Sequence, residues 1–423
     1  MPLTFWKGFL ETYVCEIRKS SLLNLKAKFS LQSLFLLSLV STCMQAVTDK
    51  NTGWKGVRPG TLWTDTSGEM IQAHGGGVLY FNHTYYWYGE NKAGPTYQPD
   101  DRYPSRVDYI GINCYSSQDL IHWHSHGVVL GHSADTASDL HPSRVVERPK
   151  VVYHEDSRTF VMWMHIDSSK YDEARIGIAV SAVPHGGFQY KGSFRPHGSE
   201  SRDMTVFLDD DGQAFLLYSS ENNMVLHVAR LNSSFTGVEP SYGRILINQQ
   251  REAPTVFKNA GLYFILSSGC TGWWPNAAEV HVSESIFGPW HSIGNPVKSS
   301  NVADRRTTFG SQGTFVLPLD PWQGRFLFMA DRWNESHLGH SRYVWLPLQV
   351  TLPPESHGLL EVLCVCSYVS KSPPLKIRCQ RPKRWGTLKA CVIRKGMCLP
   401  MIPPIITDTQ LLSWRVHHSS YPS

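Results

Sequence analysis

The sequence predicts an all-β protein and, within that class, a five-bladed β-propeller over residues 61–350. Three observations carry this prediction. Aromatic residues make up 12% of the 423 residues and charged residues 18%, beside 33 Gly and 26 Pro, a mixture typical of turn-rich β proteins. A hairpin pattern recurs at spacings of roughly 50 to 70 residues, the scale of one propeller blade. Shorter apolar runs between the hairpins supply outer strands.

The clearest hairpin lies at residues 199–220, where apolar runs at 205–208 and 214–218 flank a turn of three Asp and one Gly. Two such runs around an Asp-Gly turn are a strong hairpin signal. The pattern recurs at 77–88, 150–163, 255–266 and 314–329, and outer strands are expected at 110–115, 176–180, 225–230 and 279–282. A β-sandwich is the alternative, but it predicts no repeat at this period.

The N-terminal region has the pattern of a membrane-targeting segment. Residues 29–47 contain no formally charged side chain and follow a basic stretch, and a membrane-spanning helix needs ~20 apolar residues. We expect a cytosolic tail at 1–28, a signal anchor at 29–47 and a stem linker at 48–60. A cleaved signal peptide and a buried helix are the alternatives. The first two place the body in the secretory lumen, as do N-glycosylation sequons at Asn82, Asn232 and Asn334.

The C-terminal residues 351–423 break the hairpin pattern. They contain three Pro-Pro pairs, five of the nine Cys and many basic residues, so we expect an irregular basic tail. Much of the net charge of +5 comes from this tail, which leaves a body without the basic surface that nucleic-acid binding needs. The cysteines form no even disulfide framework, and Cys114 and Cys270 are expected to be buried thiols rather than a bridge.

Polar residues precede the first strand of each hairpin. They are His74 in the stretch 72–77, then Glu147, Asp203, Glu252 and Gln312. The innermost strands of a propeller ring a central axis, so these side chains should converge at one mouth. Burying a carboxylate costs several kcal/mol unless it is paired, which favours a functional reason for three of them. Paired carboxylates suit glycosidic cleavage, in which one acid protonates the leaving oxygen and a neighbour raises the pKa of that acid.

Each of these residues also has a structural interpretation. Asp203 could cap its hairpin, Glu252 could pair with Arg251 or an arginine of another blade, Glu147 could pair with Arg148 or Arg332, and Gln312 could bond strand backbone. Asp209, Asp210 and Asp211 are expected to form a solvated turn away from the axis. Trp273 and Trp274 could stack on a sugar or pack between blades, and His74 has no second ligand in view for a metal.

The motifs of the body, taken in order, resemble those of the five-bladed propeller glycoside hydrolases of family 43. Within that family they are most similar to the exo-β-1,3-galactanases (galactan 1,3-β-galactosidases), including plant secretory-pathway members. The matching segments are 75–77, 88–91, 115–120, 147–151, 203–212, 252–254, 272–276, 331–333 and 341–347. The resemblance covers about residues 61–348.

The resemblance implies an inverting exo-glycosidase. Glu252 matches the general acid, Asp203 the acid that tunes its pKa, Gln312 the residue that orients or activates water, and Glu147 a sugar-orienting glutamate. Where the wider family has an aspartate base in blade one, this chain has Gln72 to Gly75, a gap that the galactanase subgroup shares. Further sugar contacts are predicted at Glu90, His74, Tyr171, Asn223, Thr271 and Trp273.

The expected substrate is the β-1,3-galactan of arabinogalactan glycoproteins, from which galactose would be released at the Golgi membrane or, alternatively, in the cell wall. We expect no cofactor, no metal, no nucleic-acid partner, a membrane contact through the anchor, and a monomer. A catalytically silent carbohydrate-binding propeller is one alternative function. Arabinofuranosidase or xylosidase activity within the same family is another.

Overall fold

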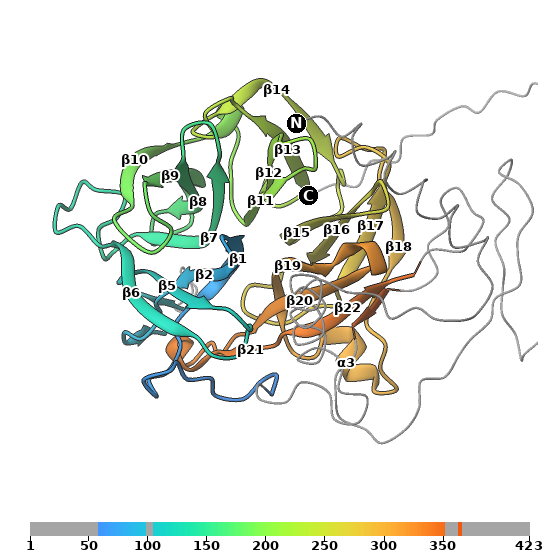
Figure 1. Cartoon of the computed structure of the whole chain (residues 1–423), viewed down its shortest axis with the longest axis horizontal. Helices are drawn as coiled ribbons and strands as arrows, with labels where there is room; N and C mark the ends of the chain where they lie inside the picture. The colour runs from blue at the N-terminus through green and yellow to red at the C-terminus, as the bar shows by residue number, and fades with distance from the viewer. Residues whose placement is uncertain (1–57, 99–104, 352–362, 366–423) are drawn as a thin grey trace, which may run out of the picture. The chain divides into compact units, whose positions relative to one another are not determined.

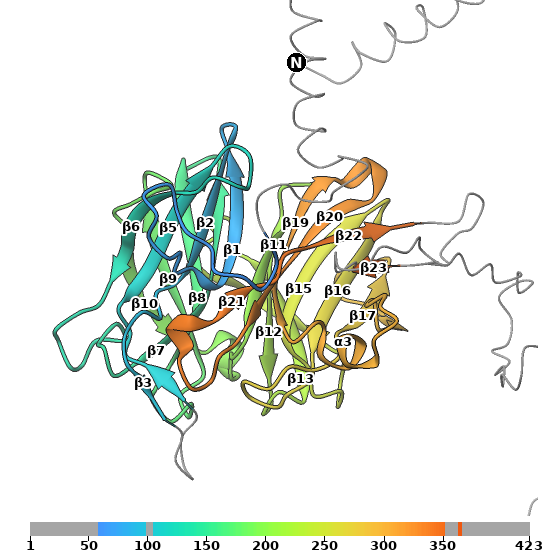
Figure 2. The same cartoon turned by 90° about the horizontal axis from the view of Figure 1, so that it is seen from below.

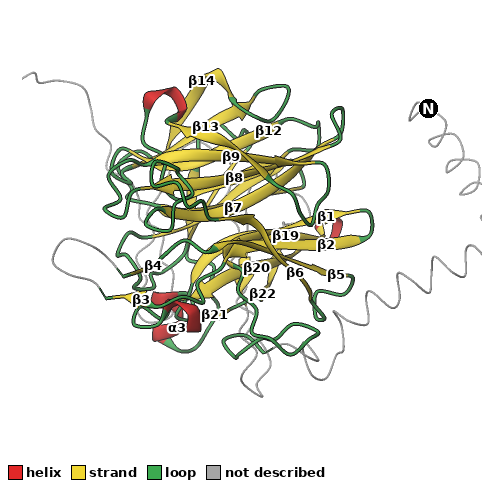
Figure 3. Ribbon diagram, turned by 90° about the vertical axis from the view of Figure 1, so that its left-hand side faces the viewer, coloured by secondary structure: helices red, strands yellow, loops and turns green. Residues whose placement is uncertain are grey.

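The structure, a computed structural model, describes residues 58–98, 105–351 and 363–365. Five sheets surround a common centre in the view of Figure 1. Figure 3 shows that the described part of the chain consists mainly of strands and loops, with a few short helical turns. Four sheets have four strands and the fifth has five. The predicted all-β, five-bladed propeller is therefore confirmed, and the β-sandwich is excluded.

Each blade is an antiparallel sheet built from the predicted hairpin and its outer strands. Blade one comprises β1 (His74–Phe81), β2 (Thr84–Glu90), β5 (Gly111–Ser117) and β6 (His124–Gly131). Blade two comprises β7 (Val145–His154), β8 (Thr159–Asp167), β9 (Arg175–Ser181) and β10 (Gln189–Phe194). Blade three comprises β11 (Met204–Leu208), β12 (Ala214–Ser220), β13 (Val225–Leu231) and β14 (Val238–Ile245).

Blades four and five follow the same plan. Blade four comprises β15 (Glu252–Asn259), β16 (Leu262–Ser268), β17 (Glu279–Ser283) and β18 (His291–Gly294). Blade five comprises β19 (Gln312–Asp320), β20 (Arg325–Arg332), β22 (Leu346–Val350) and β23 (Leu363–Val365), with the short β21 (Arg342–Tyr343) paired to β20. The remaining elements are β3 (Thr96–Tyr97) with β4 (Arg106–Val107), α3 (Val302–Thr307), and the 3-10 turns η1 (Pro196–Gly198), η2 (Pro321–Gln323) and η3 (Leu338–His340).

The inner strands β1, β7, β11, β15 and β19 contact one another in a closed cycle, and Figure 1 shows them around the centre. Figure 2 shows the blades from the side. Five hydrophobic clusters fill the spaces between neighbouring blades, one cluster for each pair. The alternating apolar residues of the hairpins supply these clusters, because successive side chains of a strand point to opposite faces of its sheet. The starts of the five inner strands are thereby brought around one axis.

A bulge interrupts the pairing at the start of several inner strands. The register shifts after His74 in β1, after Glu147 in β7 and after Glu252 in β15. The next residue is left-handed in each case: Gly75 has φ +63°, Arg148 +57° and Ala253 +50°. An added residue in one strand bends it and redirects a side chain, so the bulges aim the strand-leading residues toward the axis.

The ring closes where blade five meets blade one. Trp87 of β2 is 1% exposed and packs edge-on against Trp63, Trp123 and Trp345, with ring centroids 4.7–6.3 Å apart. Tyr343 of β21 packs on the same indole at 4.7 Å. Residues from the beginning and the end of the propeller therefore share one aromatic cluster, the seam.

Replacing Trp87 by Ala should lower the free energy of unfolding by about 3–5 kcal/mol, because it removes a buried aromatic from a packed cluster. Chemical denaturation followed by tryptophan fluorescence measures the change. Trp322 in η2 is the matched control, since it is 98% exposed and its replacement by Ala should leave the midpoint nearly unchanged. Equal effects of the two substitutions would contradict the packing role of the seam.

The sequence predicts a solvated turn at Asp209, Asp210 and Asp211 and buried, unbridged thiols at Cys114 and Cys270. The expectation of a solvated turn is wrong for Asp209, which is 7% exposed because Lys258 of blade four pairs with its carboxylate and Tyr263 donates a hydrogen bond to it. Asp210 is exposed, as expected. Cys114 and Cys270 are both free thiols, so no bridge joins them; Cys114 is buried and Cys270 half-buried.

The expected cytosolic tail and signal anchor, and most of the stem linker, lie outside the described residues. The helices within the described part of the chain include none that is long and apolar enough to cross a membrane. Of the tail expected at 351–423, the structure describes residue 351 and Leu363–Val365, and the latter segment forms strand β23 beside β22.

Candidate active site

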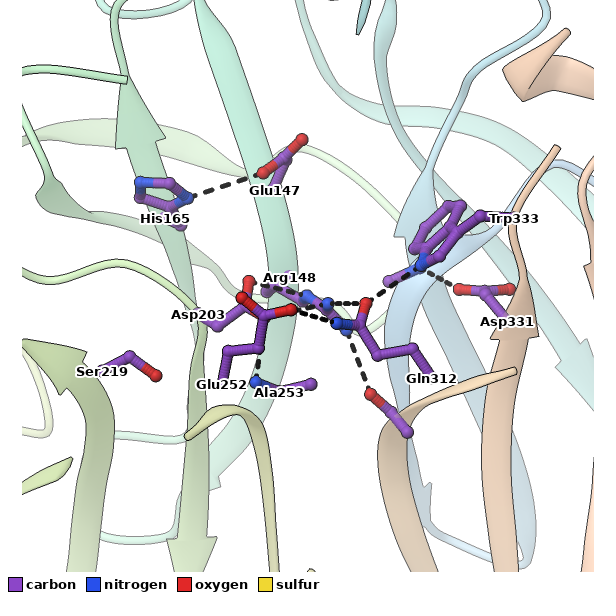
Figure 4. A network of polar contacts seen from close by, with 12 residues as sticks. Glu147, Arg148, His165, Asp203, Ser219, Glu252, Ala253, Gln312, Asp331 and Trp333 are labelled. Atoms are coloured by element: carbon purple, nitrogen blue, oxygen red, sulfur yellow. Dashed lines mark hydrogen bonds and ion pairs between the residues drawn. The ribbon is translucent and has the colours of Figure 1, made fainter. Parts of the chain in front are cut away.

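Arg148 stands at the centre of the converged side chains, as Figure 4 shows. Its guanidinium donates two hydrogen bonds to the Asp203 carboxylate, from Nε and Nη2, both at 3.0 Å. It also donates to Gln312 Oε1 at 2.6 Å and to the Gly313 carbonyl at 3.1 Å. One buried arginine of blade two thus joins residues of blades three and five.

Asp203 completes a link across three blades. Besides Arg148, it accepts a hydrogen bond at 2.9 Å from the backbone N–H of Ala253, the left-handed residue that follows Glu252. The Asp203 carboxylate therefore helps to hold the bulge that aims Glu252. These contacts run to neighbouring blades, which disfavours the interpretation of Asp203 as a cap of its own hairpin.

Glu252 is the protonated acid of the cluster. Burial raises its pKa to about 8, the negative charge of Asp203 acts in the same direction, and the charge of Arg148 opposes both. Its Oε1 accepts a hydrogen bond from Gln312 Nε2 at 2.8 Å. Arg251 is not its partner, since that side chain bonds to Ser267 and faces Glu279. A neutral carboxylic acid near pH 7 is suited to donate a proton.

The orientation of the Gln312 amide follows from its neighbours. Arg148 Nη2 and Trp333 Nε1 lie 2.6 Å and 3.0 Å from Oε1, and both groups can only donate. The atom between them is therefore the carbonyl oxygen, and both of its lone pairs are occupied. The Nε2 end must then donate to Glu252 Oε1, and because a carbonyl oxygen accepts better than a hydroxyl oxygen, this contact favours the acidic proton on Oε2.

This arrangement restricts what Gln312 can do with water. Its carbonyl oxygen has no free acceptor site, so it cannot take a hydrogen bond from a water molecule without leaving Arg148 or Trp333. Its second Nε2 hydrogen remains available as a donor. Gln312 is therefore equipped to orient a water molecule and not to remove its proton. Among the described residues, none of the hydrogen bonds of the Gln312 side chain goes to strand backbone.

A second polar cluster adjoins the first, on the side of blades one and two. Glu147 accepts a hydrogen bond from the Tyr171 hydroxyl at 2.9 Å and faces Lys92 Nζ at 3.7 Å. Lys92 also pairs with Glu90 at 2.7 Å. Burial acts to raise the pKa of Glu147, but the nearby His165 and Lys92 cations and the hydrogen bond from Tyr171 outweigh it and hold that pKa at about 2. Glu147 is thus an ionised carboxylate.

The two clusters are joined through the bulge of blade two. The backbone N–H of Arg148 donates to Glu90 Oε1 at 3.0 Å, while Lys150 Nζ donates to the carbonyls of Gly75 and Arg148 at 2.9 Å and 3.3 Å. Burial and the charge of Arg148 lower the pKa of Lys150 to about 7. A β-carbon on Gly75 would lie 2.1 Å from Glu90 Oε1, and Gly75 has a φ of +63°, so a substitution there would strain the backbone and displace the Glu90 carboxylate.

Aromatic rings border the site. Trp273 lies edge-on to Trp333 at 5.0 Å, and the Lys92 ammonium lies 5.6 Å from the Trp273 ring. Trp274 beside it is 71% exposed. A pocket next to the second cluster is lined by residues that include Glu90, Lys92, Glu147 and Tyr171.

The structure does not bring every predicted contact into this network. His74 is fully buried, stacks on Tyr343 at 5.0 Å and lies 3.3 Å from Asp331, so its ring has no open surface for a sugar. Thr271 bonds within its own loop, to Trp274 and Asn276. Asn223 lies in the β12–β13 turn, and its Oδ1 is buried without a hydrogen-bond partner among the described residues.

Comparison with known proteins agrees with this geometry. The sequence profile of glycosyl hydrolases family 43 matches residues 77–323. The chain belongs to glycosyl hydrolase family 43. A search of curated protein sequences found no match.

Solved structures of family 43 enzymes resemble the chain closely. A β-1,3-galactosidase determined with galactodeoxynojirimycin has a TM-score of 0.66 and 34% identity, over 74% of this chain and 99% of its own. An exo-β-1,3-galactanase variant from Phanerochaete chrysosporium, determined with β-1,3-galactotriose, has a TM-score of 0.63 and 37% identity, over 69% of this chain and 64% of its own. One from Clostridium thermocellum has a TM-score of 0.62 and 35% identity, over 73% and 64%. The protein is a glycoside hydrolase.

Sequence reasoning missed several members of this family 43 site. Arg148, Lys92, His165 and Trp333 contact the predicted residues, yet none was singled out as a site residue. A signal existed for Arg148, since it directly follows a strand-leading glutamate. A signal also existed for Lys92, which lies two residues after Glu90.

Proposed function

We propose that the protein is an inverting exo-hydrolase that releases galactose from the ends of β-1,3-galactan chains. The observation that carries the proposal is the pairing of Glu252, whose pKa is about 8, with Asp203, which Arg148 holds by two hydrogen bonds, in a chain that is 34–37% identical to a β-1,3-galactosidase and an exo-β-1,3-galactanase of known structure. A buried acid beside a fixed carboxylate is the arrangement that glycosidic cleavage requires.

In the proposed mechanism, Glu252 donates the proton on Oε2 to the glycosidic oxygen as the bond to the anomeric carbon breaks. Water attacks that carbon from the opposite face, oriented by the free Nε2 hydrogen of Gln312, and its released proton passes to solvent. Asp203 holds Ala253 and raises the pKa of Glu252, which keeps the acid protonated. Arg148 fixes Asp203 and Gln312 in these roles.

The second cluster is proposed to bind the terminal sugar. The Glu147 carboxylate and the Tyr171 hydroxyl lie at the pocket, and Lys92 and Trp273 border the same region. Carboxylates that accept hydrogen bonds from hydroxyls, with an aromatic ring nearby, are suited to a saccharide. The unpartnered Oδ1 of Asn223 supports a polar contact from blade three, and Thr271 is proposed as a further contact.

The proposal is tested by incubating the full chain with β-1,3-galactan and following the products by proton NMR. Galactose should be the sole early product and should appear first as the α-anomer, because inversion converts a β-linkage into an α-hemiacetal. Oligosaccharide products or initial β-galactose would contradict the mechanism. Cleavage of nitrophenyl arabinofuranoside or xyloside in place of galactan would indicate another specificity, and binding without cleavage would indicate a silent propeller.

The value of kcat/KM should fall on the alkaline side only when the pH approaches and passes the pKa of Glu252. Glu252 donates a proton, so the active form is lost as pH rises through the pKa of about 8. We expect kcat/KM on galactan to be roughly constant from pH 6.5 to 7.5 and to fall about tenfold for each pH unit well above 8. A fall of kcat/KM that begins near pH 5 would contradict the protonated state of Glu252 at neutral pH.

We further propose that the substrate is the galactan of arabinogalactan glycoproteins, and that a plant-type secretory pathway holds the enzyme as a monomer at the Golgi membrane. The uncharged stretch 29–47 and the sequons support this location. Fractionation of cells that express the full chain tests it, because a membrane-anchored luminal protein should resist carbonate extraction and become sensitive to endoglycosidase.

A further inference from the structure

His165 of β8 lies directly across from Glu147 of β7, with which it forms a register pair. The imidazole is 2% exposed. Its Nδ1 lies 3.6 Å from Glu147 Oε2, and its Nε2 lies 2.9 Å from Asp167 Oδ2. Figure 4 shows the imidazole and the Glu147 carboxylate facing each other. Each ring nitrogen of this buried histidine therefore faces a carboxylate.

The far end of this chain of contacts is fixed by backbone. Asp167 is fully buried, and its Oδ1 accepts hydrogen bonds from the N–H groups of Ser168 at 2.9 Å and Glu173 at 2.8 Å. Its other oxygen is left for His165. The carboxylate cannot turn away, so it holds the imidazole plane, and through it the Nδ1 position, against Glu147.

The charges around the ring favour its protonated form. Burial acts to lower the pKa of His165, but the hydrogen bond to Asp167 and the negative charges of Asp167 and Glu147 outweigh it and raise that pKa to about 9. With neutral imidazole, one of the two carboxylates would face an unprotonated nitrogen. An imidazolium offers a donor to each of them.

We propose that His165 is a positioning residue: held as an imidazolium between Asp167 and Glu147, it keeps Glu147 ionised and aimed at a hydroxyl of the bound sugar. The inference rests on the proposed function, because it takes Glu147 as a sugar contact. His165 itself does not touch the substrate. It acts by fixing the charge and the direction of its neighbour.

The need for a second cation follows from the composition of the cluster. Lys92 is shared between Glu90 at 2.7 Å and Glu147 at 3.7 Å, and Tyr171 contributes a neutral hydroxyl. Without His165, Lys92 would be the one described cation paired with these two buried carboxylates, while the charge of Arg148 acts on both without pairing with either. Glu147, the more distant of the two, would then take up a proton at a higher pH and lose its ability to accept from a sugar hydroxyl at that oxygen.

The test replaces His165 by Asn and by Gln, which remove the charge, and measures kcat and KM on β-1,3-galactan from pH 4.5 to 8. We expect KM to rise more than kcat falls, with kcat/KM reduced at least tenfold at pH 5 and less at pH 7.5. His281 is the matched control, because it is also buried and faces Glu279 at 3.7 Å, away from the site. A purely structural role would lower activity equally at all pH values and would overturn the inference.

Two further measurements do not depend on turnover. Nitrogen-15 NMR of the wild-type imidazoles should show His165 protonated from pH 5 to 8, and a neutral ring at pH 7 would overturn the inference even if the substituted proteins fail to fold. In the Glu252→Gln background, His165→Asn should weaken binding of β-1,3-galactotriose about tenfold at pH 5, and unchanged binding would count against it. If the wild type neither binds nor cleaves galactan, the proposed function fails, while the NMR result still decides the charge of His165.

Discussion

Replacing Glu252 by Gln is expected to lower kcat for galactose release from β-1,3-galactan by about 10²–10⁴-fold, the usual contribution of general acid catalysis. The amide is nearly the same size as the acid but cannot protonate the leaving oxygen. Substrate binding should be retained, so the change should appear in kcat rather than in KM. Single-turnover and steady-state assays on the purified full chain measure both quantities.

The matched control for this substitution is Glu284→Gln. Glu284 belongs to the same blade and is exposed, and its replacement should leave kcat within about twofold of the wild type. Leaving-group dependence gives a second check. An aryl galactoside with a good leaving group needs little protonation, so Glu252→Gln should lose less activity on it than on galactan. Full activity on galactan would exclude Glu252 as the acid.

Replacing Arg148 by Met should lower the free energy of unfolding by about 3–5 kcal/mol, because it leaves the partly buried Asp203 carboxylate without its cation. The substitution also removes the donor that orients the Gln312 carbonyl. We therefore expect kcat/KM to fall by at least about 100-fold at a temperature where the variant is still folded. Denaturant titration and galactan assays on the same preparation separate the two effects.

A double-mutant cycle with Asp203→Asn sharpens this prediction. The pair Arg148→Met and Asp203→Asn should be more stable than Arg148→Met alone, because the unpaired charge is gone, yet it should remain inactive. Arg244→Met is the control, since Arg244 forms a half-exposed, solvent-screened ion pair with Glu221 and its replacement should leave the denaturation midpoint nearly unchanged. Independent effects of Arg148 and Asp203 would contradict their coupling.

The arrangement of blades could be predicted from the sequence because each hairpin is encoded locally. The turn at 209–212 and the alternating apolar residues on either side of it decide the β11–β12 pairing without long-range information. Repetition of that pattern then fixes the architecture, since neighbouring blades bury each other's apolar faces. Glu252, Asp203 and Gln312 could be found by their shared place in this repeat.

The remaining features depend on contacts that no local pattern contains. Arg148 meets residues more than 50 positions away, and only the left-handed backbone at that residue turns it from its own strand toward Asp203 and Gln312. Asp209 carries the charge of a surface turn but is buried because Lys258 of the next blade reaches it. Thr271 and Asn223 were predicted as sugar contacts, but both lie in loops, and the directions of loop side chains are set by packing that the sequence does not display.

Because the seam around Trp87 joins the first blade to the last, the turnover rate also shows whether the ring of blades has closed. Gln312 and Trp333 belong to the last blade and Lys92 to the first, so the site is complete only when the two ends of the ring are joined. A protein cut between blades four and five would keep Asp203 and Glu252 on one piece and Gln312 on the other. Recovery of turnover on mixing the two fragments would then measure how readily they reassemble into the closed five-bladed ring.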